Sequence, residues 1–117
     1  MTKRIHLIGI CGTGMATLAA MLKARGFDVQ GSDASVYPPM SDFLAAEQIQ
    51  AFDGYAPEHI SGVLDSVIVG NAISRGNAEL EEVLDRKIPY QSMPEAIREH
   101  FLWSARSIVI AGTHGKT

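Results

Sequence analysis

Ile5-His6-Leu7-Ile8-Gly9-Ile10-Cys11-Gly12-Thr13-Gly14-Met15 is the stretch that decides the fold of this chain. It predicts a strand that ends in a glycine-rich turn and leads into a helix beginning near Gly14. In such a turn the backbone comes close to an anionic ligand, and the free N–H groups of the new helix can bind a diphosphate. The glycine spacing, G-x-x-G-x-G, differs from the G-x-G-x-x-G of dinucleotide-binding turns and argues against NAD or FAD. The alternative is that the glycines only permit a tight turn and close helix packing.

Beyond this unit, short β-branched runs alternate with helical stretches, which is typical of a parallel sheet. We therefore expect an α/β fold, a Rossmann-like three-layer parallel sheet of five to six strands with helices on both faces. The predicted strands cover residues 4–8, 28–32, 49–51, 66–69, 89–91 and 107–111. The predicted helices cover residues 14–25, 40–47, 77–86 and 94–100, with Gly26 as a C-terminal cap and Asn77 and Ser92 as N-terminal caps.

Composition excludes several classes of protein. The chain has 117 residues, 46% apolar and 20% charged, as expected for one globular domain. Its net charge is −3 and its Lys and Arg are scattered, so we expect no nucleic-acid partner. No apolar run approaches the roughly 20 residues that span a bilayer, and we expect a cytoplasmic protein without a membrane partner. A single cysteine, Cys11, fits a reducing compartment.

Two further segments belong to the carboxyl edge of the predicted sheet. Asp33 closes the second strand and could accept hydrogen bonds from ribose hydroxyls, with Ser32 beside it as a turn cap or phosphate contact. Asn71-Ala72-Ile73-Ser74 follows the fourth strand and is placed to face a diphosphate or a base. For both segments the alternative is that the polar side chains only stabilise turns.

A second phosphate-loop pattern, Gly112-Thr113-His114-Gly115-Lys116-Thr117, follows the last predicted strand. The backbone of such a loop binds the phosphates of a nucleotide. Lys116 would bind the phosphates as well, and the Thr117 hydroxyl would ligate Mg²⁺. The pattern departs from G-x-x-x-x-G-K-[ST], because its first glycine would fall on Ile110. We expect residues 1–106 to form one domain and residues 107–117 to begin an ATP-binding domain.

Other polar residues are expected to be structural. Cys11 is expected to fill the turn, and His59 and His100 to lie at the surface. The acidic positions of the third predicted helix form its solvated face: Glu79, Glu81, Glu82 and Asp85.

Four segments follow one another along the chain: the first glycine loop, Gly31-Ser32-Asp33, Asn71–Ser74 and the second phosphate loop. Their order resembles the start of the Mur ligases, which use ATP to join amino acids or peptides to UDP-linked muramic acid. The stretch Ser32–Ser41 resembles the branch that attaches the tripeptide L-Ala-γ-D-Glu-meso-diaminopimelate in peptidoglycan recycling. The branch that adds L-alanine is the alternative, and it usually has glycine where Cys11 stands.

The resemblance implies that this domain holds UDP-N-acetylmuramate, that ATP and Mg²⁺ bind at the second loop, and that an absent C-terminal domain selects the peptide. It implies UDP-sugar contacts from Gly12, Thr13, Gly14, Met15, Ser32, Asp33, Asn71, Ala72, Ile73 and Ser74. It also implies ATP contacts from Gly112, Thr113, His114, Gly115, Lys116 and Thr117, with Lys116 and Thr117 in the chemical step and Thr117 on the metal. In the whole enzyme ATP would phosphorylate the lactyl carboxylate of the muramic acid. The isolated chain is then expected to bind the UDP-sugar without catalysing ligation.

Two other classes remain open on the residues alone. A nicotinamide-dependent oxidoreductase domain is favoured by the strand-glycine-helix unit and Asp33, and opposed by the glycine spacing and the second loop. A nucleotide-sensing module without chemistry is the other.

Overall fold

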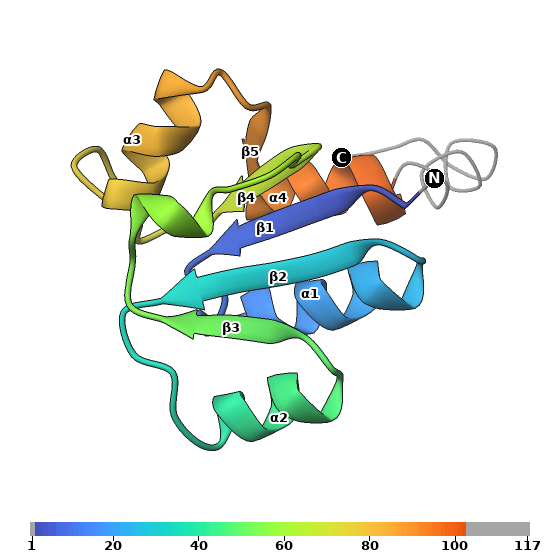
Figure 1. Ribbon diagram of the computed structural model, residues 1–117. Helices are drawn as coiled ribbons and strands as arrows, with labels where there is room; N and C mark the ends of the chain where they lie inside the picture. Colours follow the sequence, from blue (N-terminus) through green and yellow to red (C-terminus); the bar gives the residue numbers. More distant parts are fainter. Residues whose placement is uncertain (1, 103–117) are drawn as a thin grey trace, which may run out of the picture.

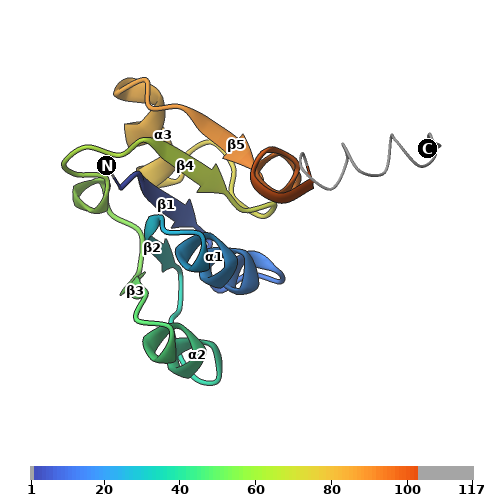
Figure 2. The same ribbon diagram turned by 90° about the vertical axis from the view of Figure 1, so that its right-hand side faces the viewer.

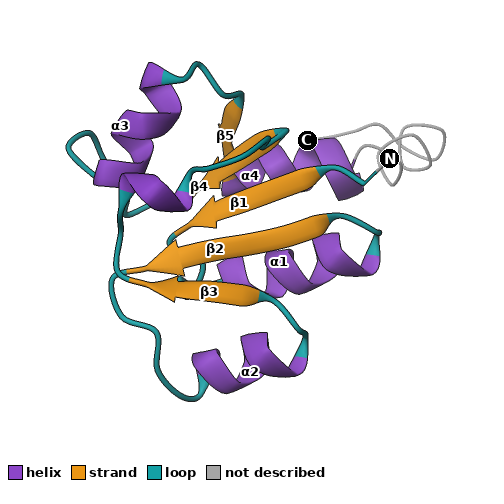
Figure 3. Ribbon diagram, in the orientation of Figure 1, coloured by secondary structure: helices purple, strands orange, loops and turns teal. Residues whose placement is uncertain are grey.

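The structure, a computed structural model, describes residues 2–102. Five strands alternate with helices along this part of the chain (Figure 3). In chain order the elements are β1 (Arg4–Ile8), α1 (Met15–Ala24), β2 (Asp28–Asp33), α2 (Met40–Ala46), β3 (Gln50–Asp53), the 3₁₀ turn η1 (Pro57–His59), β4 (Ser66–Val69), α3 (Ala78–Asp85), β5 (Tyr90–Ser92), α4 (Met93–Ile97) and the π-helical turn η2 (Arg98–Leu102).

All strand pairs are parallel, and the sheet has the order β3-β2-β1-β4-β5 (Figure 1). The chain builds outward from β1 to β3 and then returns to place β4 on the other side of β1. The order therefore reverses between β1 and β4, which is where parallel α/β sheets bind their ligands. The expected α/β fold is confirmed, and the sixth predicted strand, residues 107–111, lies outside the described residues.

Helices cover both faces of the sheet (Figure 2). On one face, Ile5 and Leu7 of β1 pack with buried side chains of α1, α2 and α4. On the other face, Ile8 of β1 packs with Leu80 and Val83 of α3 and with Ile60, which follows η1. The sheet is thus the middle of three layers, as expected.

Local sequence explains why the helices begin and end where they do. Met15, Leu18, Ala19 and Leu22 recur at helical spacing and form the buried stripe of α1. Gly26, with φ +99°, ends the helix by donating its N–H to the Lys23 carbonyl at 2.9 Å. Asn77 caps α3, and Ser92 caps α4 in a reciprocal capping box with Glu95, so both predicted N-terminal caps are confirmed.

The predicted boundaries agree closely with those observed, and the largest difference is at the last helix. The predicted span of 94–100 is divided between α4 and the π-helical turn η2. Within residues 2–102 no helix combines the length and the apolar character needed to cross a membrane.

Candidate functional site

A cleft of about 840 Å³ opens at the carboxyl ends of the strands. Gly9 and Thr13, which follow β1, form one wall, and Gly70 and Asn71, which follow β4, form the other. The cleft therefore lies at the point where the strand order reverses.

The glycine loop is held by its own backbone. The N–H groups of Gly9 and Ile10 both donate to the Ser32 carbonyl, at 2.8 and 2.9 Å. Gly12 then donates to the Gly9 carbonyl at 2.9 Å, so the loop folds back on the end of β1. Gly9 has φ +88°, a conformation that favours glycine.

Gly14 ends this loop and is the N-cap of α1, with φ +81°. It offers no side chain to cap the helix, and the first turn of α1 contains no acidic residue. The positive end of the helix dipole is therefore uncompensated by side chains beside the cleft, which suits an anionic ligand.

Asp33 connects β2 to the glycine loop. Its Oδ2 accepts a hydrogen bond from the Cys11 N–H at 3.0 Å, and the residue also lines the cleft. Burial, and then the charges of Asp33 and Asp53, raise the pKa of the Cys11 thiol. A raised pKa favours the protonated thiol, which is less reactive than the thiolate.

The opposite wall is the loop between β4 and α3. Asn71, Ala72, Ile73 and Ser74 all line the cleft. The side chain of Ile73 lies under the glycine loop, where a Cβ on Gly9 would be 3.5 Å from Ile73 Cγ1. The two walls are therefore in contact where Ile73 meets Gly9.

Most of the residues predicted to contact a UDP-sugar meet at this cleft. Gly12, Thr13, Met15, Asp33 and the segment Asn71–Ser74 line it. Gly14 lies beside it at the helix N-cap. The Ser32 side chain does not reach it, because that side chain is fully buried behind the cleft. The predicted ATP and metal residues, Gly112–Thr117, lie outside the described residues.

The expectation that Glu79 lies on a solvated helix face is wrong. Glu79 is fully buried, and its carboxylate accepts four hydrogen bonds. The donors are His6 Nε2 at 2.8 Å, His59 Nδ1 at 2.6 Å, the Ala56 N–H at 3.2 Å and the Ser32 hydroxyl. His59 also stacks on Phe52, with 4.1 Å between ring centroids, so it is not the free surface histidine that was expected.

The tautomer of His6 follows from its other neighbour. Arg4 Nη2 donates to Gln30 Oε1 at 2.9 Å, which turns the Gln30 amide nitrogen toward His6 Nδ1 at 2.8 Å. Nδ1 must then be an acceptor, and the ring proton is on Nε2, where it points at Glu79. Burial raises the pKa of Glu79, but the hydrogen bonds from His6, Ser32 and His59 outweigh burial and lower it below its ordinary value.

Residues from β5 and α4 also line the cleft and were not anticipated. Ser92 is the last residue of β5, and Met93 and Pro94, which begin α4, come directly after it at the same edge of the sheet. The signal was present in the sequence, since the carboxyl ends of parallel strands share one edge. Tyr55 after β3 and Arg75 before α3 also line the cleft and were not assigned from the sequence.

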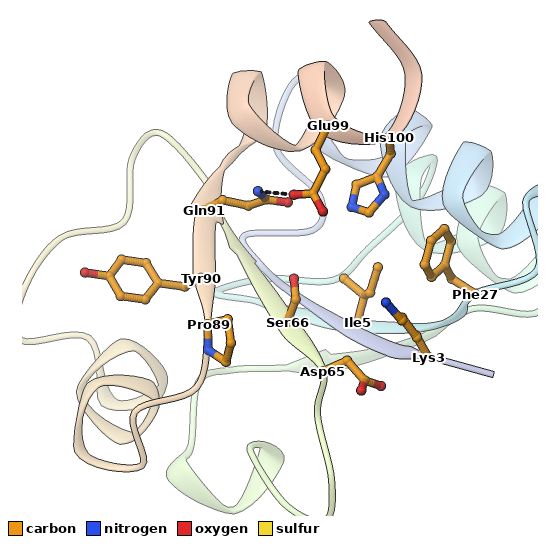
Figure 4. A pocket seen from close by; sticks show the side chains of 10 residues that line it. All are labelled: Lys3, Ile5, Phe27, Asp65, Ser66, Pro89, Tyr90, Gln91, Glu99 and His100. Atoms are coloured by element: carbon orange, nitrogen blue, oxygen red, sulfur yellow. Dashed lines mark hydrogen bonds between the residues drawn. The ribbon is translucent and has the colours of Figure 1, made fainter. Parts of the chain in front are cut away.

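A second, smaller pocket of about 180 Å³ lies at the opposite edge of the sheet (Figure 4). Lys3, Asp65 and Pro89, which precede β1, β4 and β5, contribute to it, and Gln91 donates to Glu99 across it at 2.8 Å. Ligands of parallel sheets bind at the carboxyl ends of strands, which favours the larger cleft as the candidate site. Within residues 2–102 no group of three or more His, Cys, Asp or Glu side chains could hold a metal ion.

Comparison with known proteins gives the family. Residues 4–102 match the family described as Mur ligase family, catalytic domain. The chain is 46% identical over 97% of its length to the Escherichia coli UDP-N-acetylmuramate–L-alanyl-gamma-D-glutamyl-meso-2,6-diaminoheptandioate ligase. It is 41% identical, over the same share, to the Rickettsia bellii UDP-N-acetylmuramate–L-alanine ligase.

A solved structure, a murein peptide ligase from Psychrobacter arcticus, superposes with a TM-score of 0.83 and 42% identity. The match covers 87% of this chain and 21% of that protein. The chain spans about a quarter of the length of the curated relatives named above. The match over residues 4–102, the strand order and the position of the cleft agree, and the chain belongs to the Mur ligase family.

Proposed function

We propose that this chain is the UDP-sugar-binding domain of an ATP-dependent ligase that joins L-Ala-γ-D-Glu-meso-diaminopimelate to UDP-N-acetylmuramate. The observation that carries the proposal is the cleft at the reversal of strand order, with the glycine loop and the uncapped end of α1 on one wall. The diphosphate would lie over Gly12, Thr13 and Gly14, the uridine ribose would face Asp33, and Asn71–Ser74 would cover the other side. Ser32 would act indirectly, because its carbonyl holds the glycine loop.

The tripeptide is favoured over L-alanine by the comparisons. Two relatives named for the tripeptide reaction are 46% and 44% identical to the chain, whereas six relatives named for the L-alanine reaction are 35% to 41% identical. In this proposal residues 1–106 bind the nucleotide-sugar and residues 107–117 begin the ATP-binding domain, where Lys116 and Thr117 would hold ATP and Mg²⁺.

The proposal is tested by isothermal titration calorimetry with UDP-N-acetylmuramate, UDP, NAD and ATP at one salt concentration. We expect the UDP-sugar to bind, UDP to bind more weakly and NAD not to bind. Binding of NAD in preference to UDP-N-acetylmuramate, or binding of none of the uridine nucleotides, would overturn the proposed function of this chain.

A substitution in the cleft tests whether the ligand binds there. Gly14 is unsuitable for this purpose, because its φ of +81° would strain any larger residue. Ala72 is exposed and lines the cleft, so Ala72→Glu puts a bulky anion in the binding space. We expect this variant to abolish binding, whereas Ala45→Glu, on the exposed side of α2, should bind as wild type does. Equal binding by both variants would place the ligand elsewhere.

A further inference from the structure

The cleft carries one charge of each sign on opposite walls. Among the described residues that line it, Asp33 is the anionic side chain and Arg75 is the cationic one. Asp33 ends β2, whereas Arg75 lies in the loop between β4 and α3. These two charges can orient a ligand that has neutral hydroxyl groups at one end and negative oxygens elsewhere. Its hydroxyl groups would face Asp33 and its anionic oxygens would face Arg75.

The guanidinium of Arg75 already holds an anion in this structure. Its Nε donates to Glu81 Oε2 at 2.7 Å and its Nη2 donates to Glu81 Oε1 at 3.2 Å. The N–H of Gly76 adds a third hydrogen bond to Glu81 Oε2 at 2.9 Å. The Arg75 hydrogen bonds, followed by that from Gly76, lower the pKa of Glu81 to about 2, so its carboxylate is ionised at neutral pH.

The ion pair between Arg75 and Glu81 can be broken at a small cost in free energy. The side chain of Arg75 is 75% exposed and that of Glu81 is 40% exposed. Exposed ion pairs are weak because water and salt screen them. A phosphate or a second carboxylate accepts the same two-pronged hydrogen bonds from a guanidinium, so a ligand in the cleft can replace Glu81 without loss of geometry.

We propose that Arg75 is a specificity-determining residue of the cleft. When the nucleotide-sugar binds, Arg75 leaves Glu81 and binds an anionic oxygen of the ligand. Glu81 is therefore an internal competitor of the ligand for Arg75. The inference rests on the proposed function, because it takes the cleft as the nucleotide-sugar site. Two anionic groups of UDP-N-acetylmuramate share the required chemistry, the diphosphate and the lactyl carboxylate.

The test measures the affinity of the chain for UDP-N-acetylmuramate by calorimetry in wild type, Arg75→Gln and Glu81→Gln. Arg75→Gln removes the cation and is expected to weaken binding about tenfold, which is the usual effect of losing a hydrogen bond to a charged group. Loss of the competitor is expected to tighten binding about two- to fivefold, the range that an exposed ion pair allows. A merely structural role for the pair would move both variants in the same direction.

Matched controls remove the effect of net charge. Arg98→Gln and Glu47→Gln make the same charge changes at exposed positions that do not line the cleft, and both should bind as wild type does. Thermal unfolding of each variant shows whether it is folded. The salt dependence of binding should be shallower in Arg75→Gln than in wild type, because one ionic contact is lost.

Titrations with UDP and UDP-N-acetylglucosamine identify the anion. An equal loss in Arg75→Gln for all three ligands assigns the contact to the diphosphate, and a loss confined to UDP-N-acetylmuramate assigns it to the carboxylate. Unchanged binding of all three by Arg75→Gln, or weaker binding by Glu81→Gln, would overturn the inference while leaving the proposed function intact. Failure of the wild-type chain to bind any of them would overturn both.

Discussion

The two faces of β1 are built from different chemistry. Ile5 and Leu7 point to a face where apolar side chains of α1, α2 and α4 cover them. His6 points to the other face, where it hydrogen-bonds to buried Glu79 of α3. Apolar packing is non-directional and stabilises the sheet at many relative orientations, whereas hydrogen bonds require defined distances and angles. Apolar packing stabilises both faces, because Ile8 packs with Leu80 and Val83 of α3 beside His6. On the His6 face, called the polar face below, the hydrogen bonds to Glu79 add a constraint on where α3 and η1 stand relative to β2.

This difference matters because the polar face lies behind the cleft. Glu79 is bonded to Ser32, whose carbonyl holds the glycine loop, and it lies at the start of the helix that follows the Asn71–Ser74 wall. One carboxylate therefore connects both walls. The predictions below separate the contributions of the two faces.

The largest effect is expected on the apolar face, at Gly31. A Cβ there would be 2.6 Å from both the Leu7 carbonyl oxygen and Ile10 Cδ1, and the backbone oxygen cannot rotate away. We expect Gly31→Ala to lower the free energy of unfolding by about 3 kcal/mol, measured by urea denaturation. Gly26→Ala is the control, since it meets no neighbour and adds only the strain of φ +99°, about 1 kcal/mol. Equal losses would show that the close approach at Gly31 is not a constraint.

On the polar face, Glu79→Gln is expected to cost about 2 kcal/mol of unfolding free energy. Glutamine keeps the shape of the side chain, but its NH₂ group cannot accept hydrogen bonds. That group would face donors whose hydrogen bonds the carboxylate oxygen accepted. Asp85→Asn, at an exposed position of the same helix, should change stability by less than about 0.5 kcal/mol. If urea denaturation gives the same small change for both, Glu79 does not organise this face.

The acid dependence of stability should follow Glu79 as well. Its pKa in the folded chain is lower than in the unfolded chain, so its ionised form stabilises the fold above the ordinary carboxyl pKa. We expect the free energy of unfolding to fall as the pH drops below about 4.5 toward the folded pKa. The slope should be smaller in Glu79→Gln, measured by denaturation between pH 6 and pH 3. Identical slopes would assign the acid sensitivity to other carboxylates.

Local patterns in the sequence were sufficient for the sheet and for much of the cleft. The strands at 4–8 and 66–69 were predicted to the residue, because each is an apolar or β-branched run that ends at a glycine. Most cleft residues were predicted because parallel strands end at one edge.

The buried network could not be predicted in the same way. Glu79 is 73 positions from His6, 47 from Ser32 and 20 from His59. The local sequence around Glu79 is acidic, as on a solvated helix face, and only its spacing of four residues from Val83 indicates that this carboxylate lies on the buried side of α3. Its burial follows from partners that only the fold brings together. The place of Arg75 on the cleft wall was missed for a similar reason, since it depends on how the loop before α3 folds.

The smallest expected effect compares two helix caps on the rim of the cleft. Asn77 accepts hydrogen bonds from the N–H groups of Glu79 and Leu80, and Ser92 accepts one from the N–H of Glu95. Replacing either with alanine should cost about 1 kcal/mol of unfolding free energy. The two variants should differ in amide hydrogen exchange, because only Asn77→Ala frees the turn that carries Glu79. Faster exchange at Glu79 and Leu80 in Asn77→Ala, with slow exchange retained in Ser92→Ala, would show that the cap and the buried carboxylate act together. Slow exchange in both variants would show that the hydrogen bonds to the Glu79 side chain hold this turn without the cap.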